Sequence, residues 1–189
     1  MAKKTFSFIL VFVLFLYLLS GCDDNSTDEY NQSLHEFKKL TLKSGLKAEG
    51  VCNMIEAIWT DTIYGNLNAD TAEYTHSNGV VHDSFNTSLA LFFVSESYKA
   101  DKELIESGLS EVDKMYLSLA GPPKGCEEGY KIATTLYEQY EIVIGLAANP
   151  SGSLNSYSDA FSDADTEYAN AYKKLDRYFE AVEFTPKAD

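Results

Sequence analysis

The hydrophobic positions of the chain recur at helical spacing over most of its length. In the clearest run, steps of three and four residues alternate across eight intervals. Its members are Leu154, Tyr157, Phe161, Ala164, Tyr168, Ala171, Leu175, Tyr178 and Val182. Such alternation places all of them on one helix face and is typical of a helix–helix interface. Ser153 precedes the run at a suitable N-cap position, so we predict a helix over residues 153–182.

The same spacing predicts three further helices, over residues 34–66, 83–119 and 124–148. Strand-like alternation is hard to find. Helix breakers lie before and after the third of these helices, at Gly121-Pro122-Pro123 and at Asn149-Pro150-Ser151-Gly152. Residues 67–82 are the one long connection, and they lack a clear period.

The lengths of the connections indicate how the predicted helices are arranged. Two of the three connections are short, and short connections between long amphipathic helices place neighbours antiparallel. We therefore predict an all-α fold in which residues 34–189 form an antiparallel up-down-up-down four-helix bundle.

The first 21 residues have a pattern of their own. Lys3 and Lys4 precede Phe6–Leu19, a run of 14 residues interrupted only by Ser7 and Tyr17. A helix of that length spans about 21 Å, short of the roughly 30 Å hydrocarbon core of a membrane. A positive start and a short apolar run predict an export signal over residues 1–21. The alternative is an N-terminal membrane helix with an incidental cysteine after it.

The segment ends in Leu19-Ser20-Gly21-Cys22, which resembles the lipobox of bacterial lipoproteins. The resemblance implies removal of residues 1–21 and acylation of Cys22. It also implies an extracytoplasmic protein that is lipid-anchored to the bacterial membrane, since each buried methylene of an acyl chain contributes about 0.8 kcal/mol. Asp23 resembles the inner-membrane retention signal of enteric Gram-negative lipoproteins, a rule without meaning for a Gram-positive source.

Residues 23–33 hold four acidic side chains and no basic one. Such a stretch has too little apolar surface to order itself. We therefore predict that residues 22–33 form a flexible, disordered acidic tether, with a reach of about 15–20 Å.

The body also resembles a known group, although more weakly. The pattern around Trp59, Pro122-Pro123 and Pro150–Leu154 is similar to that of small helical lipoproteins of unknown function from Gram-positive bacteria and their mobile elements. This resemblance implies a helical fold and carries no activity with it.

Charge narrows the range of partners. The chain has 29 acidic and 15 basic side chains, a formal charge of −14, and Arg177 is its only arginine. Nucleic acid is excluded as a partner, because duplex binding needs clustered Lys and Arg. Residues 34–47 are a local exception. They contain four lysines, Lys38, Lys39, Lys43 and Lys47, and only one acidic residue, Glu36. Two roles agree with this segment: contact of the lysines with an anionic membrane surface beside the lipid anchor, or a solvated lysine face on an ordinary bundle helix.

Two cysteines remain if Cys22 is acylated, Cys52 and Cys126, and two cysteines in an exported protein suggest a disulfide. The pairing depends on the first helix. If Gly45–Gly50 breaks it, the two thiols lie level with each other. If the helix runs unbroken from Leu34, Cys52 is about 27 Å along it and the two thiols stay separate and buried.

No motif for catalysis is present, neither a phosphate-binding glycine loop nor a zinc-protease helix or serine-hydrolase elbow. Glu73, His76 and His82 share the long connection, but their spacing matches no usual metal-ligand pattern. The tyrosines on the apolar faces either fill the core or line an apolar pocket. We therefore predict a non-enzymatic protein without cofactor or metal.

Three functions agree with these observations. The first is a lipid-anchored cell-envelope module that presents a surface to an unidentified envelope protein. A phage-exclusion subtype of it rests on analogy with prophage-encoded lipoproteins. The second is a lipoprotein that binds a small or apolar ligand in the bundle core, and the third is a structural envelope protein without a discrete site.

Overall fold

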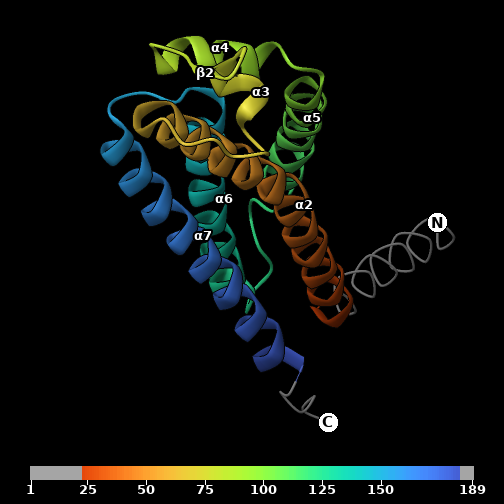
Figure 1. The fold of residues 1–189 in the computed structure, drawn as a ribbon. Helices are drawn as coiled ribbons and strands as arrows, with labels where there is room; N and C mark the ends of the chain where they lie inside the picture. The colour runs from red at the N-terminus through yellow and green to blue at the C-terminus, as the bar shows by residue number, and fades with distance from the viewer. Residues whose placement is uncertain (1–22, 184–189) are drawn as a thin grey trace, which may run out of the picture.

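The computed structural model describes residues 23–183, and these are mostly helical (Figure 1). The elements, in chain order, are α2 (Asp23–Tyr64), α3 (Ala72–Thr75), β1 (His76–Ser77), β2 (Val80–Val81), α4 (Phe85–Val94), α5 (Glu96–Ser118), α6 (Glu127–Ala148) and α7 (Leu154–Glu183). A mainly helical fold is thus confirmed. Within these residues, none of the helices combines the length and the apolar character needed to cross a membrane.

Helix α2 is the central element of the fold. It has 42 residues, a length of about 63 Å if straight, and it packs against α5, α6 and α7. The other large interface joins α6 to α7. In Figure 1, α2 crosses the molecule beside these three helices, and α4 lies across the end of α2. The hydrophobic core therefore forms around α2.

The start of α2 corrects the prediction of a disordered tether over residues 22–33 for its described part, residues 23–33. The backbone is helical from Asp23 onward, and the hydroxyl of Tyr30 donates a hydrogen bond of 3.0 Å to the carbonyl of Leu119. Asn31 accepts a bond of 3.1 Å from Tyr178 on α7. The composition of residues 23–33 shows only how much apolar surface the segment itself has. It cannot show hydrogen bonds to Leu119 and Tyr178, which lie far away in sequence.

Helix α7 presents the predicted apolar face to the core. Seven of its nine predicted positions are buried, from Tyr157 to Tyr178, and Leu154 and Val182 at the two ends are half-buried against the same core. The spacing of three and four residues therefore identified the buried face of this helix correctly.

The four long helices meet near their midpoints, at a level that we call the waist. Ser44 of α2 shares a hydrogen bond of 2.8 Å with the hydroxyl of Tyr140 on α6. Gly108 of α5 lies against Ser44, and Tyr168 of α7 lies against Gly45. Two glycines allow this close approach, because a side chain at either position would clash.

The predicted helix over residues 83–119 is interrupted in the structure, which corrects that prediction. Ser95 has an extended backbone, with φ −68° and ψ 153°, and its hydroxyl accepts a bond from the Tyr98 N–H that caps α5. The apolar part before the break becomes α4, which packs on α2 and α3. Neither proline nor glycine marks this break, so helical spacing alone did not reveal it.

The long connection contains regular structure. After α3, the short strands β1 and β2 form an antiparallel hairpin. In it His76 pairs with Val81, and Ser77 pairs with Val80. Asn78 and Gly79 make its turn, both with positive φ. Thr71 ties the connection to α2 by donating a bond of 2.7 Å to the Asp61 carboxylate.

Candidate functional site

The predicted anchor lies outside the described residues. This applies to the signal segment 1–21 and to the lipobox Leu19-Ser20-Gly21-Cys22 with its acylation residue Cys22. The described part of the chain begins with Asp23, which follows Cys22 and is the first residue of α2. Lipidation at Cys22 therefore stays a prediction.

The predicted disulfide between Cys52 and Cys126 is not formed: both cysteines are free and buried. Helix α2 runs unbroken through Gly45 and Gly50, so the two thiols lie at different levels. Cys52 interacts with Val143 and Tyr157, whereas Cys126 interacts with Tyr178. Tyr157 and Tyr178 are 21 residues apart on α7, about 31 Å, which is far beyond disulfide reach.

The four predicted membrane-contact lysines do not form one basic surface. Lys38 is mostly buried, pairs with Asp176 of α7 and lies over the Tyr172 ring, 4.2 Å from its centroid. Lys47 faces α5, where it pairs with Asp101 at 2.9 Å.

The other two lysines differ from each other. Lys39 pairs with Glu36 of its own helix at 2.7 Å, and Lys43 is exposed at the waist. Lys38, the first of the four, is 15 residues from Asp23, about 22 Å along α2. Contact with a membrane surface stays a prediction, and it would require α2 to lie along that surface.

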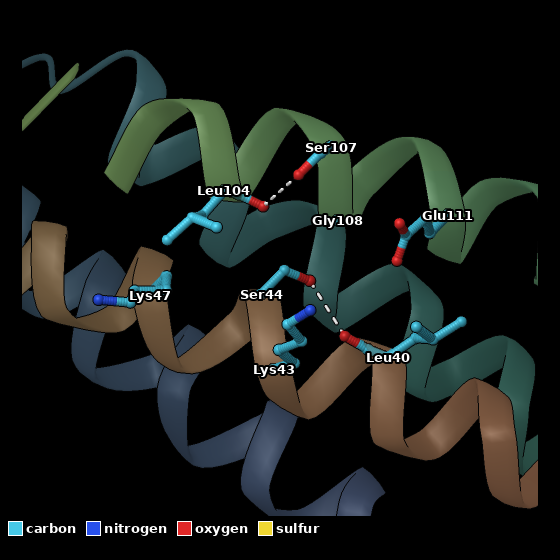
Figure 2. A pocket seen from close by; sticks show the side chains of 8 residues that line it. All are labelled: Leu40, Lys43, Ser44, Lys47, Leu104, Ser107, Gly108 and Glu111. Atoms are coloured by element: carbon cyan, nitrogen blue, oxygen red, sulfur yellow. Dashed lines mark hydrogen bonds between the residues drawn. The ribbon is translucent and has the colours of Figure 1, made fainter. Parts of the chain in front are cut away.

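A shallow pocket of about 90 Å³ opens at the waist between α2 and α5 (Figure 2). Its lining is Leu40, Lys43, Ser44, Lys47, Leu104, Ser107, Gly108 and Glu111. The Ser44 and Ser107 hydroxyls donate to carbonyls of their own helices, those of Leu40 and Leu104. The lining serines are thus already bonded, and the volume suits only a few water molecules.

A larger pocket of about 300 Å³ lies between α5 and the last turns of α6. Its lining is largely apolar, with Ile105, Leu109, Ile144 and Ala147 beside the Tyr98 ring. Lys102 and Glu106 stand at it as an ion pair 3.6 Å apart. This volume is at the lower limit for pockets that bind small molecules.

Buried tyrosines fill the space between α2, α6 and α7. Tyr140 and Tyr157 are almost fully buried, and burial raises the pKa of Tyr140 to about 12, against the lowering effect of its bond with Ser44. Tyr157 donates to the Leu146 carbonyl at 3.3 Å, and burial raises its pKa further. Both side chains serve packing, with their hydroxyls bonded to neighbours.

The end of the molecule formed by residues 61–94, which we call the cap, exposes apolar side chains. Six large ones are at least 40% exposed: Ile63, Tyr64, Leu67, Val80, Leu91 and Val94. Helix α4 contributes Ala90, Leu91 and Val94 from one exposed face and has no charged residue. Large exposed apolar patches are typical of interaction surfaces, which makes the cap a candidate for one.

The cap is fixed to the end of α2 by buried contacts. The Trp59 and Phe85 rings stack with centroids 4.6 Å apart, and Thr62 donates a bond of 2.9 Å to Ser88. Phe92 packs edge-on against Tyr74, with 5.3 Å between centroids. These contacts hold α4 in place while its outer face stays open.

Charge is distributed unevenly about the waist. The half that includes the cap, residues 44–106 and 138–168, holds 16 acidic and 3 basic side chains. The opposite half, residues 23–43, 107–137 and 169–183, holds 12 acidic and 9 basic side chains. The formal charges are therefore −13 and −3.

Comparison with known proteins adds no constraint. No family model, curated protein or solved structure matches this chain.

The cap is the feature that sequence patterns did not identify. Leu91 and Val94 of α4 are at helical spacing, so spacing alone does not distinguish them from core positions. One signal was nonetheless in the sequence, since no Lys or Arg occurs between Lys47 and Lys99. Within the described residues, no group of three or more His, Cys, Asp or Glu side chains could hold a metal ion.

Proposed function

We propose that this chain is a lipid-anchored module of the bacterial cell envelope that binds another protein and catalyses no reaction. The observation that carries the proposal is the Leu19-Ser20-Gly21-Cys22 sequence after a short apolar run with two lysines before it. An acylated Cys22 would be joined directly to α2, whose last residue is about 60 Å away along the helix.

The fold supports this proposal by supplying a rigid spacer. We interpret α2, α5, α6 and α7 as an antiparallel up-down-up-down four-helix bundle, because all four meet at the waist through Ser44, Gly108, Tyr140 and Tyr168. With the anchor at one end of α2 and the cap at the other, the strongly acidic half would point away from an anionic membrane surface. This orientation leaves the cap accessible to a partner.

The anchor is tested by following processing and membrane association of the full chain in a bacterial host. We expect the wild type to incorporate a labelled fatty acid, to lose its first 21 residues and to sediment with membranes. Cys22→Ala should abolish the fatty-acid labelling and the removal of residues 1–21, whereas Cys52→Ala should leave both unchanged. The proposal fails if Cys22→Ala behaves like the wild type.

The interaction is tested by crosslinking in intact envelopes, followed by purification of the anchored chain. We expect a discrete partner that is absent when the Cys22→Ala variant is used. Recovery of the chain alone, even after crosslinking, would favour a structural envelope protein without a discrete site.

A second candidate function is binding of a small apolar ligand, favoured by the pocket of about 300 Å³ between α5 and α6. The neutral probe N-phenyl-1-naphthylamine should gain fluorescence on binding there. Ala148→Phe, which fills the pocket, should remove the gain in fluorescence. Ala100→Phe, at an exposed position of α5 outside the pocket, should not. Equal fluorescence from both variants would exclude this pocket as the binding site.

A further inference from the structure

The cap combines six exposed apolar side chains with acidic residues and has no Lys or Arg. The cap contains Asp61, Asp70, Glu73 and Asp83, and no Lys or Arg. Asp61 is buried and accepts bonds from Thr71 and Asn66, so it supports the fold. Asp70, Glu73 and Asp83 are exposed and free to act on a partner.

The same residues limit what can cover this surface. An anionic membrane would be repelled by the acidic side chains and by the −13 charge of this half of the molecule. A second copy of the chain would bring acidic cap against acidic cap, which like-charge repulsion disfavours. A partner with basic residues around an apolar centre matches both the charge and the apolar groups.

We propose that the cap is the docking surface for a protein whose contact face carries Lys or Arg around apolar side chains. The inference rests on the proposed interaction function and assigns it to one end of the fold. Apolar contact at Leu67, Val80 and Val94 would supply the buried centre of the interface. The acidic groups would steer the basic partner and fix its orientation.

Two equally exposed leucines allow a matched test. Leu67 in the cap is 75% exposed, and Leu117 at the far end of α5 is 72% exposed. The full, anchored chain carries the photocrosslinking residue benzoylphenylalanine at one of these positions, and adducts form in intact envelopes. We expect a discrete protein adduct from position 67 that is about tenfold stronger than the adduct from position 117. Position 117 lies outside the proposed interface, so its side chain would not contact the partner.

The charge argument is tested on the same adduct. The partner segment crosslinked to position 67 should carry a net positive charge when it is identified by mass spectrometry. Raising the salt of isolated envelopes from 0.15 M to 1 M shortens the screening length from about 8 Å to about 3 Å, so the adduct should weaken about tenfold.

Neutral substitutions distinguish the effect of the cap's own acidic side chains from the effect of the protein's net charge. Asp70→Asn, Glu73→Gln and Asp83→Asn, made together, should weaken the adduct by about tenfold. The control combines Glu111→Gln, Glu128→Gln and Glu180→Gln, three exposed acids of the opposite half, and should leave it within about twofold.

Several outcomes would overturn the inference. A protein adduct at position 117 and none at 67 would place the interface elsewhere and leave the proposed function intact. An adduct at 67 with lipid, with a second copy of this chain or with an acidic segment would refute the stated partner. Absence of protein adducts at both positions would count against the docking surface and the interaction function together.

Discussion

Gly108 of α5 lies so close to Ser44 of α2 that a β-carbon on the glycine would be 2.4 Å from the β-carbon of Ser44. Ser44 in turn bonds the hydroxyl of Tyr140 on α6 at 2.8 Å. One small residue therefore sets the spacing of α2 and α5 at the waist, where α6 is also attached.

Gly108→Ala adds a methyl group that overpacks the α2–α5 contact, at a cost of about 1–3 kcal/mol. Alanine stabilises a helix over glycine by about 1 kcal/mol, so we expect a net destabilisation of up to about 2 kcal/mol. The free energy of unfolding in urea, followed by circular dichroism, measures the effect. Gly50→Ala is the matched control, since nothing lies within 4 Å of its added methyl group, and it should stabilise the protein. A stabilising Gly108→Ala would show that the helices can separate at no cost.

Tyr30→Phe should cost about 0.5–1.5 kcal/mol, because it leaves the Leu119 carbonyl without its bond from the first part of α2. The measurement is the same urea unfolding. Tyr64→Phe serves as control, since Tyr64 is 69% exposed at the other end of the helix and should change nothing. Amide hydrogen exchange gives a second reading: protection of residues 27–33 is expected, and exchange at the rate of an unfolded chain would restore the tether interpretation.

Cys52 and Cys126 should both titrate as free thiols once the chain is unfolded without reductant. In the folded protein Cys52 should react slowly at pH 8, because burial raises its pKa to about 11 and leaves only about one molecule in a thousand as thiolate. Ellman's reagent measures both stages. In the chain acylated at Cys22, Cys126→Ser should halve the number of thiols that titrate after unfolding. A wild-type chain that shows no thiols until reductant is added would mean that a disulfide forms after all.

Glu49→Gln should raise the melting temperature at pH 7. Burial, and then the negative charge of Asp165, raises the pKa of Glu49 above its unfolded value. Between these two values the folded state binds more protons, so this group's contribution to stability falls as the pH rises through the folded pKa. The gain of the variant should therefore shrink as the pH is lowered toward about 4. Glu167→Gln, an exposed acid of α7, controls for net charge, and an equal rise in both variants would refute the local explanation.

The sequence predicted the helices well where a single face is buried. The alternating steps from Tyr157 to Tyr178 identified the buried face of α7, and the proline-containing breakers marked both ends of α6 within a few residues. Both signals are local, because a residue's place on a helix face depends only on its neighbours along the chain.

Predictions that depended on distant partners were less accurate. Residues 23–33 were expected to be disordered, but Tyr30 and Asn31 bond to groups 89 and 147 residues away. The Cys52–Cys126 pairing depended on whether α2 breaks at two glycines, and one of them, Gly45, is where Tyr168 packs. A glycine in a helix is consistent with either a break or a close contact, and only the neighbouring helix distinguishes them.

The sequence by itself determined the helical character of the body, the position of the acidic and basic residues along the chain, and the resemblance of its start to a lipoprotein signal. Periodicity and composition are properties of the chain in order, so they need no partner. Only the tertiary structure decided that charge divides at the waist and that six apolar side chains stay exposed on the cap. Those properties arise from which helix faces cover one another, and that depends on contacts between residues far apart in sequence.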